Sequence, residues 1–324
     1  RHLLMKSWRL PNSARVGKSA MQTNEELTPE LSLAKNGKSF DWAGRLLNNE
    51  TGRDAAQLYS FCRILDDMAD GDIPNGPQRL LAVRFGLSNR STSEDLILME
   101  LTDFIVRKKI PFEIIIAMID GLLQDQNIVD VKDEDELLQY CYRVAGTVGL
   151  MMSQILGCTN KNALLHAIDL GIAMQLTNIA RDVLEDAHMG RRYLPASWVG
   201  DISPDKILSV SGSGACQEQE KISTAVKQLI DLSEIYYKSG LVGLIYLRPR
   251  DHLAIAVAAK IYRQIGIQIK SNGYKWYEGR EITTKRSKFA CSIRSTRNLA
   301  SRLFQIPQHQ KSLHVALAGL PYVD

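Results

Sequence analysis

The sequence predicts an all-α protein. From Ser39 onward apolar residues recur at helical spacing, no segment sustains the two-residue alternation of a strand, and only ten prolines interrupt 324 residues. No shift in composition marks an internal boundary, so we expect one helical domain over residues 25–304 with a C-terminal tail over 305–324. The expected helices lie near residues 39–48, 51–70, 94–108, 111–127, 134–157, 161–187, 216–246, 250–272 and 283–303. Loops are expected at 72–76 and 190–198, and a flexible connection at 209–214.

Residues 1–24 differ from the rest of the chain because they contain five basic residues and no acidic one. Met21 precedes a polar lead-in to the first periodic segment. We expect an extension upstream of the domain, and a surface-binding arm or a targeting segment is the alternative.

Composition and charge exclude several classes of protein. Hydrophobic residues at 45% and charged residues at 23% are typical of a globular protein, and the net charge of +4 is too small to indicate nucleic-acid binding. A small anionic substrate or an anionic membrane surface fits this charge better. Five widely spaced cysteines without a CxxC pair predict neither a disulfide framework nor a zinc site, and they indicate a reducing, cytoplasmic setting. The sequence contains no run of 18 or more apolar residues, so no membrane-spanning helix is predicted.

The stretch QLTNIARDVLEDAHMGRRYLP at 175–195 carries a polar stripe on an apolar helix. Its members stand at i, i+3, i+7 and i+11, and they are Gln175, Asn178, Asp182 and Asp186. An isolated carboxylate is costly in a dry interior, whereas Mg²⁺ prefers carboxylate, water and phosphate oxygens as ligands. From this stripe alone, two interpretations are equally supported. The stripe is either a site for metal ions and phosphate or an acidic face in contact with solvent.

A second stripe of the same kind ends the helix expected at 51–70. In LYSFCRILDDMAD, Tyr59, Arg63, Asp66 and Asp70 stand at i, i+4, i+7 and i+11, with apolar residues around the remaining faces. Two apolar helices that each end in carboxylates at i and i+4 favour one shared metal site.

Three other segments each leave two interpretations open. Small residues in YCYRVAGTVG, from Ala145 to Gly149, indicate either close helix packing or space for a long apolar substrate whose head Tyr140 would approach. In HMGRRYLP, Arg191 and Arg192 either approach the metal end or lie in solvent. The basic residues between 285 and 297 form either a solvated face or a contact with anionic lipid headgroups.

Taken in order, SFDWAGRLL, LYSFCRILDDMAD, YRVAGTVG and QLTNIARDVLEDAHMGRRYLPASW resemble the squalene and phytoene synthase family. The resemblance covers about Lys38 to Arg297 and is strongest to the bacterial members that form phytoene. It implies an all-α isoprenoid synthase of the type I terpenoid class, a single helical bundle with a central cavity. It also implies that two geranylgeranyl diphosphates are joined head to head through prephytoene diphosphate to give phytoene, with release of two diphosphates, as the first step of carotenoid biosynthesis.

The resemblance further implies roles for residues in this sequence. Mg²⁺, with Mn²⁺ as the alternative ion, would be held by Asp66, Asp70, Asn178, Asp182 and Asp186, and no NADPH is expected. Arg63 and Tyr262 would act with the four aspartates in catalysis. The substrate would contact Lys38, Ser39, Phe40, Tyr140, Val144, Ala145, Gly149, Gln175, Asn178 and Arg280. Val148 and Leu176 are further expected cavity walls, and Gly44 leaves room that favours a twenty-carbon chain.

The sequence leaves two alternatives to this function open. One is a farnesyl diphosphate-using dehydrosqualene, hydroxysqualene or squalene synthase, and the other is a non-catalytic assembly factor. Asn36 departs from the family pattern, in which histidine is frequent at this position. We expect a cytoplasmic enzyme at the inner face of a membrane, with other carotenoid-pathway enzymes as partners and no nucleic acid.

Overall fold

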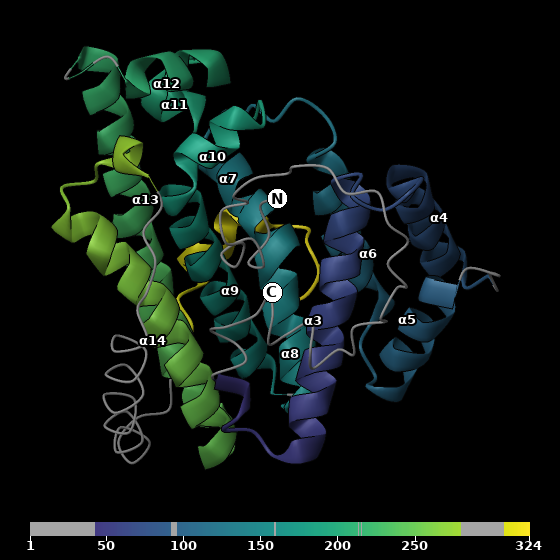
Figure 1. Cartoon of the computed structure of the whole chain (residues 1–324). Coiled ribbons are helices and arrows are strands. Elements are labelled where there is room, and N and C mark those ends of the chain that lie inside the picture. The colour runs from purple at the N-terminus through teal and green to yellow at the C-terminus, as the bar shows by residue number, and fades with distance from the viewer. Residues whose placement is uncertain (1–42, 92–95, 159, 213, 215, 280–307) are drawn as a thin grey trace, which may run out of the picture.

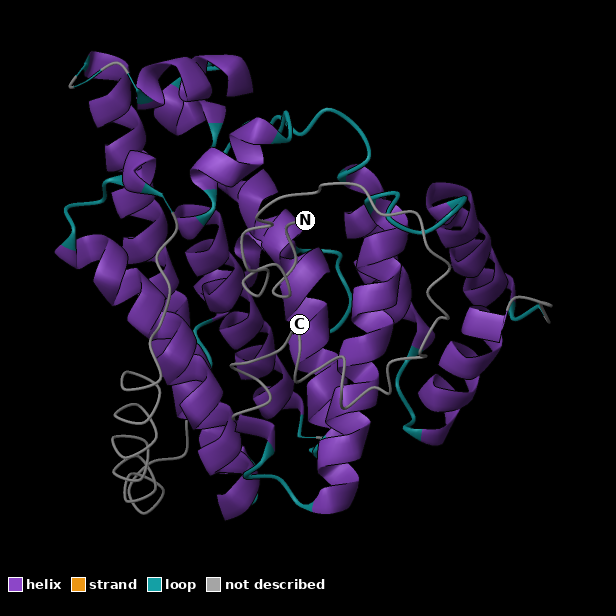
Figure 2. Cartoon of the chain, in the orientation of Figure 1, coloured by secondary structure: helices purple, strands orange, loops and turns teal. Residues whose placement is uncertain are grey.

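The computed structural model describes residues 43–91, 96–158, 160–212, 214, 216–279 and 308–324. These residues form helices joined by loops, without any β-strand, and the predicted all-α class is confirmed (Figures 1 and 2). The α-helices are α3 (Asn49–Ala69), α4 (Gly76–Asn89), α5 (Leu96–Arg107), α6 (Phe112–Gln124), α7 (Glu134–Cys141), α8 (Thr147–Ile155), α9 (Lys161–Arg181), α10 (Val183–His188), α11 (Ala196–Val199), α12 (Pro204–Ser211), α13 (Gln217–Val242) and α14 (Pro249–Ser271). Between them lie a π-helical turn, η2 (Tyr142–Gly146), and the 3₁₀ turns η3 (Gly243–Tyr246), η4 (Trp276–Glu278) and η6 (Lys311–Leu317).

Helix α9 is the centre of the bundle. It packs against α13, α8, α14 and η2, and α3 packs on the other side of α8 (Figure 1). By length and composition α9 is apolar enough to cross a membrane, but 89% of its most apolar 18-residue window is buried inside the fold. We therefore assign α9 as the core helix of the bundle.

Local sequence signals set where the main helices begin. The side chain of Asn48 accepts a hydrogen bond from the Thr51 amide at 2.8 Å, and that of Asp133 accepts one from the Glu136 amide at 2.9 Å. Glu136 in turn accepts from the Lys132 amide at 2.7 Å, so α7 begins with a reciprocal cap. Proline opens α12 and α14, where its missing amide proton costs nothing.

Glycines let α8 and α9 approach each other closely. A Cβ on Gly149 would lie 2.2 Å from the Ala167 carbonyl oxygen, and one on Gly171 would lie 2.2 Å from that of Ala145. The close-packing interpretation of the small residues near 145–149 is therefore confirmed. The turn before α8 is π-helical rather than α-helical, which the sequence pattern did not indicate.

Several predicted boundaries were wrong. Helices α4 and α12 were not predicted, and α12 occupies part of the connection expected at 209–214. The buried positions of α4, Leu80, Val83 and Leu87, do follow a helical period, and their signal is weakened by polar neighbours. The helix expected at 161–187 is interrupted at Asp182, whose φ of −104° and ψ of 17° separate α9 from α10.

Some predictions concern residues outside the described part of the chain. They are the extension at 1–24, Asn36, Lys38, Ser39, Phe40, Arg280, the helix at 283–303 and the basic residues between 285 and 297.

We expect Gly149→Ala to lower the free energy of unfolding by about 1–3 kcal/mol, because the added methyl group meets backbone atoms of α9 that cannot rotate away. Gly212→Ala is the matched control, since Gly212 has no atom within 4 Å of the new Cβ and a right-handed helical conformation. Thermal unfolding of both variants tests this. Equal melting temperatures would contradict the close contact.

Candidate active site

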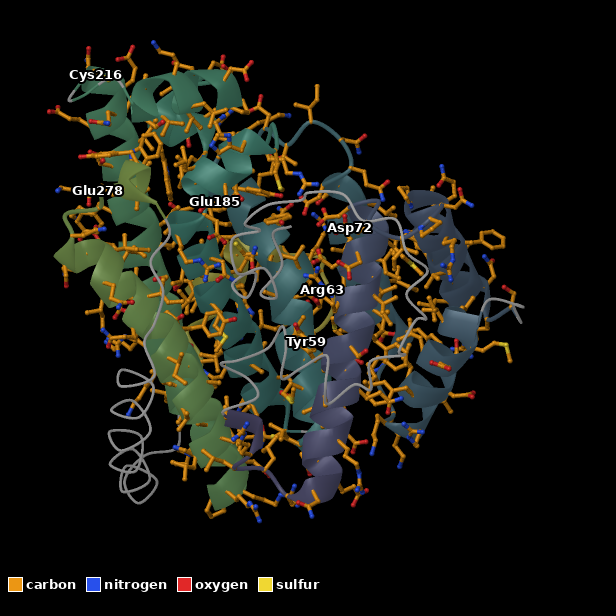
Figure 3. The ribbon with its side chains drawn as sticks, in the orientation of Figure 1. Tyr59, Arg63, Asp72, Glu185, Cys216 and Glu278 are labelled. Carbon is orange, nitrogen blue, oxygen red and sulfur yellow. The ribbon has the colours of Figure 1, made fainter. Side chains whose placement is uncertain are left out.

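The two predicted acidic stripes lie at the ends of α3 and α9 and converge. Arg191, which follows α10, reaches Asp70 at the end of α3 with 3.3 Å between Nη2 and Oδ1. Burial raises the pKa of Tyr59, and Asp182 outweighs burial to raise that of Arg181. Tyr262 on α14 adds to both increases, so it lies near Tyr59 on α3 and Arg181 on α9. The acidic ends of both helices therefore lie at the same end of the bundle, where Figure 3 shows Asp72, just after α3, and Glu185 of α10.

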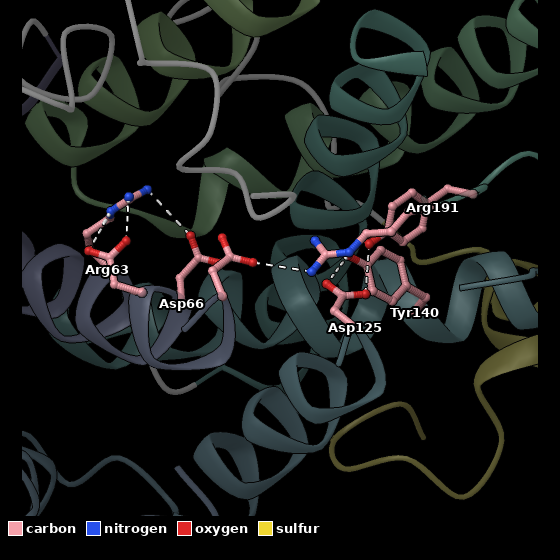
Figure 4. Close-up of polar contacts among 8 residues, drawn as sticks. Arg63, Asp66, Asp125, Tyr140 and Arg191 are labelled. Atoms are coloured by element: carbon pink, nitrogen blue, oxygen red, sulfur yellow. Dashed lines mark hydrogen bonds and ion pairs between the residues drawn. The ribbon is translucent and has the colours of Figure 1, made fainter. Parts of the chain in front are cut away.

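On α3 the acidic row is held by Arg63. Its guanidinium group donates to Asp67 over 2.5 and 3.2 Å and to Asp66 over 3.4 Å (Figure 4). Burial by itself would lower the pKa of Arg63, but the adjacent Asp66 and Asp67 outweigh it and raise the pKa above its ordinary value. Arg63 thus stays charged and fixes the orientation of the row. Asp66 is 3% exposed and Asp70 lies one turn further on.

On α9 the second row contains an arginine that sequence reasoning missed. Arg181 donates to both carboxylate oxygens of Asp182, at 2.7 and 2.5 Å, and its side chain is fully buried. A cation at Asp182 therefore has to compete with this guanidinium group. The signal in the sequence is the Arg-Asp pair itself, since an arginine inside an otherwise apolar helix needs a buried partner.

The amide groups of the second row lie next to each other. Gln175 and Asn178 are both buried, and the Asn178 amide donates to Gln175 Oε1 over 3.4 Å. Asn178 Oδ1 is buried and has no hydrogen-bond partner within the described part of the chain. A buried amide oxygen in this position suits a metal ion or a water bound to one.

Arg191 belongs to a second polar network behind the acidic rows. Asp125, which caps α6, accepts from the Tyr140 hydroxyl at 2.9 Å and from the Tyr193 hydroxyl at 2.7 Å (Figure 4). Burial alone would lower the pKa of Arg191, but Tyr193, Asp125 and Asp70 raise it overall, so the guanidinium group is charged. Its Nη1 atom is buried with no partner among the described residues.

This network gives Tyr140 a different place from the one predicted. Its hydroxyl is occupied by Asp125, and its ring packs on that of Tyr193 with 4.8 Å between centroids. Tyr140 therefore holds Asp125, whose negative charge acts on Arg191. Sequence reasoning missed both Asp125 and Tyr193. The three residues lie far apart in the sequence, so no local spacing relates them.

Only one of the two loop arginines turns toward the acidic rows. Arg192 is buried and donates to the carbonyl groups of Val131 and Leu194 and pairs with Asp130. These contacts hold the loop against the segment before α7, where Asp130 and Arg192 form an isolated parallel bridge. Arg191 therefore has a role at the site, whereas Arg192 has a structural one.

Two apolar cavities of about 110 and 70 Å³ lie below the acidic rows. Leu170, Gly171 and Met174 of α9 line the larger one, and Met174 is one turn before Asn178. Leu58, Tyr59 and Cys62 of α3 line the smaller one, and Cys62 is one turn before Asp66. The cavities share a wall formed by Val148, Met152, Ile255 and Ala258.

The cavity-wall predictions divide into two groups. Ala145, Val148 and Gly149 line the larger cavity and Gly44 the smaller one, so the small residues near 145–149 leave space for a ligand as well as for α9. Val144 and Leu176 line neither cavity. Val144 instead faces Gly121 of α6, because the π-helical turn rotates it away from the cavity.

The residues present fit a divalent oxygen-seeking ion. Among the described residues around the two helix ends, carboxyl groups outnumber guanidinium groups, and the buried Oδ1 atom of Asn178 adds a neutral oxygen donor. Asp66, Asp70, Asn178, Asp182 and Asp186 are the residues that would hold such ions. Their metal role stays a prediction.

A profile of the family described as squalene/phytoene synthase matches residues 33–288. The chain belongs to the squalene/phytoene synthase family. It is 33% identical over 271 residues to a phytoene synthase of Pseudescherichia vulneris, covering 80% of this chain and 86% of that protein. It is 32% identical to the 15-cis-phytoene synthase of Pantoea ananas, covering 84% and 91%, and 36% identical to the phytoene synthase of Thermus thermophilus, covering 75% and 82%. The predicted family is confirmed, and the chain is a prenyl-transferring enzyme.

Solved structures agree with this assignment. A dehydrosqualene synthase in complex with a ligand superposes with a TM-score of 0.71 at 25% identity, covering 84% of this chain and 95% of that one. The squalene synthase of Alicyclobacillus acidocaldarius superposes with a TM-score of 0.65 at 20% identity, covering 77% and 94%, and it supports the fold alone. The predicted isoprenoid synthase bundle is confirmed.

We expect Arg191→Gln to weaken the binding of inorganic pyrophosphate in the presence of Mg²⁺ by about tenfold, because a charged hydrogen bond contributes about 1.5–3 kcal/mol. Isothermal titration calorimetry measures this. The neighbouring Arg192→Gln should lower the melting temperature and leave the affinity unchanged, since its contacts are structural. An equal loss of affinity in both variants would contradict the assignment of Arg191.

Proposed function

We propose that this enzyme joins two molecules of geranylgeranyl diphosphate head to head to form phytoene through prephytoene diphosphate. The overall reaction releases two diphosphates and two protons and needs no reductant. The observation that carries the proposal is the pair of adjoining apolar cavities that lie under two converging acidic helix ends. Relatives named phytoene synthase at 33 and 36% identity support the same reaction.

The acidic ends would hold the diphosphate groups. When bound, Mg²⁺ supplies neutralising charge that makes diphosphate a leaving group. Arg63 orients Asp66, and Arg191 places a charged, buried guanidinium group beside Asp70, where it can contact phosphate oxygens. Tyr262 of α14 is buried near Tyr59 and Arg181.

The cavities would hold the two prenyl chains and exclude water. Loss of the first diphosphate leaves an allylic cation, and the double bond of the second chain attacks it. Water would trap this cation, so the surrounding wall has to be apolar. The shared wall of Val148, Met152, Ile255 and Ala258 carries no charged group and keeps the two chains side by side.

The residues of the smaller cavity support a prenyl chain of twenty carbons. Ala43, Gly44, Gly52 and Ala55 line this cavity, and a Cβ on Gly44 would meet no atom of the described residues within 4 Å. Small side chains leave room for a twenty-carbon chain. The fifteen-carbon alternative has its own support in the structural likeness to a dehydrosqualene synthase.

Incubation of the purified protein with Mg²⁺ and either geranylgeranyl or farnesyl diphosphate, without NADPH, tests the proposal directly. We expect a forty-carbon hydrocarbon with the absorption spectrum of phytoene. A thirty-carbon product formed in preference would contradict the chain length, and the absence of product from both substrates would support the non-catalytic alternative.

Asp66→Asn should lower kcat by about 100-fold or more, because it removes a charge that acts on the leaving group. Asp67→Asn is the matched control, since Asp67 is adjacent and pairs with the same Arg63. The Asp67→Asn variant should lose at most about tenfold in kcat, because the Asp67 carboxylate acts only through Arg63. Circular dichroism of both variants should show unchanged helical content. A larger loss from Asp67→Asn would refute the role of Asp66.

A further inference from the structure

A buried cluster of histidine and aspartate side chains lies away from the acidic rows. Asp169 of α9 is fully buried, and it is nine residues before Asn178, which places it about 13 Å away along the helix axis. His309 Nε2 lies 2.8 Å from Asp169 Oδ2, and His314 Nε2 lies 2.9 Å from Oδ1. One donor atom from each of the three residues lies within 4.8 Å of the other two.

The two histidines come from a C-terminal segment, residues 308–324, that docks on α7 and α13. The Tyr236 hydroxyl donates to the Leu313 carbonyl at 2.8 Å, and the Gln139 amide donates to the Ala316 carbonyl at 2.9 Å. The Tyr142 hydroxyl donates to the carbonyl of Pro321. The segment therefore has a fixed position, and its histidines reach Asp169 in a defined orientation.

The hydrogen bonds around the cluster fix where the protons lie. His314 Nδ1 is 3.1 Å from the Val323 carbonyl oxygen, which can only accept, so Nδ1 carries a proton. In the neutral imidazole, Nε2 then presents a lone pair to Asp169. A lone pair facing a carboxylate oxygen at 2.9 Å requires a proton or a cation between the two atoms.

The surrounding groups complete the polar environment of Asp169. The Ser239 hydroxyl of α13 donates to Asp169 Oδ2 and therefore accepts from His166 Nδ1 at 3.1 Å. His166 Nε2 is then an acceptor that is buried without a partner among the described residues. Within the described part of the chain, no lysine or arginine pairs with Asp169, so histidinium or a bound cation has to balance its charge.

We propose that Asp169, His309 and His314 form a binding site for a zinc-class divalent metal ion that fastens the C-terminal segment to α9. Two imidazole nitrogens and one carboxylate oxygen are the donor set that Zn²⁺ accepts, with a water molecule in the fourth position. The proton on His314 Nδ1 and the Ser239 hydroxyl supply the outer hydrogen bonds that orient such ligands.

A metal ion would change the spacing of these atoms. Bonds of about 2.1 Å in a tetrahedral site separate ligand atoms by about 3.4 Å. His309 Nε2 and His314 Nε2 lie 2.8 and 2.9 Å from different oxygens of Asp169, so an ion held by both histidines would either use both carboxylate oxygens or require the three side chains to rearrange. Binding displaces any proton held between each histidine and Asp169, so affinity falls as the pH is lowered.

The position of the site gives it a consequence for the fold. His166 and Leu170, on either side of Asp169 in α9, line the larger apolar cavity. A metal ion on Asp169 would therefore bind directly beside the residues of α9 that form one wall of the cavity.

The full-length protein, stripped with a chelator and returned to buffer containing excess Mg²⁺, should bind one equivalent of Zn²⁺ by elemental analysis. Co²⁺ bound at this site should give the intense visible absorption bands of tetrahedral coordination. Co²⁺ bound by the oxygen-rich acidic rows does not give these bands. Added Zn²⁺ should raise the melting temperature.

His309→Gln and Asp169→Asn should each abolish the Co²⁺ bands and the stabilisation by Zn²⁺. His252→Gln is the matched control, because His252 is also buried and its Nδ1 also faces a backbone carbonyl, at 2.8 Å. It should retain both effects. No tetrahedral Co²⁺ spectrum in the wild-type protein, or the same spectrum in His309→Gln, would overturn the proposal, and circular dichroism identifies a variant that fails to fold.

Discussion

The burial of carboxyl groups at the ends of two apolar helices is the constraint on which the site depends. Asp66 and Asp186 are each 3% exposed, and a buried carboxylate is costly unless a cation or several hydrogen bonds balance it. Arg63, Arg181 and Arg191 supply part of this balance and keep the carboxyl groups in place. The site therefore keeps more carboxyl groups than guanidinium groups. Divalent ions bound together with a diphosphate would balance this excess negative charge.

Helix α9 connects the close packing on α8, the larger cavity, the second polar row and the C-terminal segment. It packs on α8 and on the turn η2 so closely that a Cβ would clash at Gly149 and at Gly171, while Leu170, Gly171 and Met174 line the larger cavity. Asn178 of the second row lies one turn after Met174, and Asp169 connects the same helix to the C-terminal segment. Because these roles fall on one rigid helix, packing, cavity shape and the position of Asn178 are mechanically linked.

The parts of the site that depend on local spacing could be predicted from the sequence. The two stripes ending at Asp70 and Asp186, and the small residues from Ala145 to Gly149, are patterns of helical spacing along a short stretch of sequence. Asp125, Tyr193 and the histidines on Asp169 could not be predicted this way, because their partners lie on other elements. The π-helical turn and the interruption at Asp182 likewise depend on how α8, α9 and α10 pack rather than on helix propensity.

The central claim is that the acidic ends of α3 and α9 bind a diphosphate jointly through divalent ions. Electron paramagnetic resonance of Mn²⁺, titrated with and without an unreactive geranylgeranyl thiodiphosphate, tests this most directly. We predict that the analogue tightens Mn²⁺ binding and produces spin coupling between neighbouring ions, and that Asp186→Asn removes both effects. Mn²⁺ binding that is independent of the analogue, or unchanged in Asp186→Asn, would contradict the account.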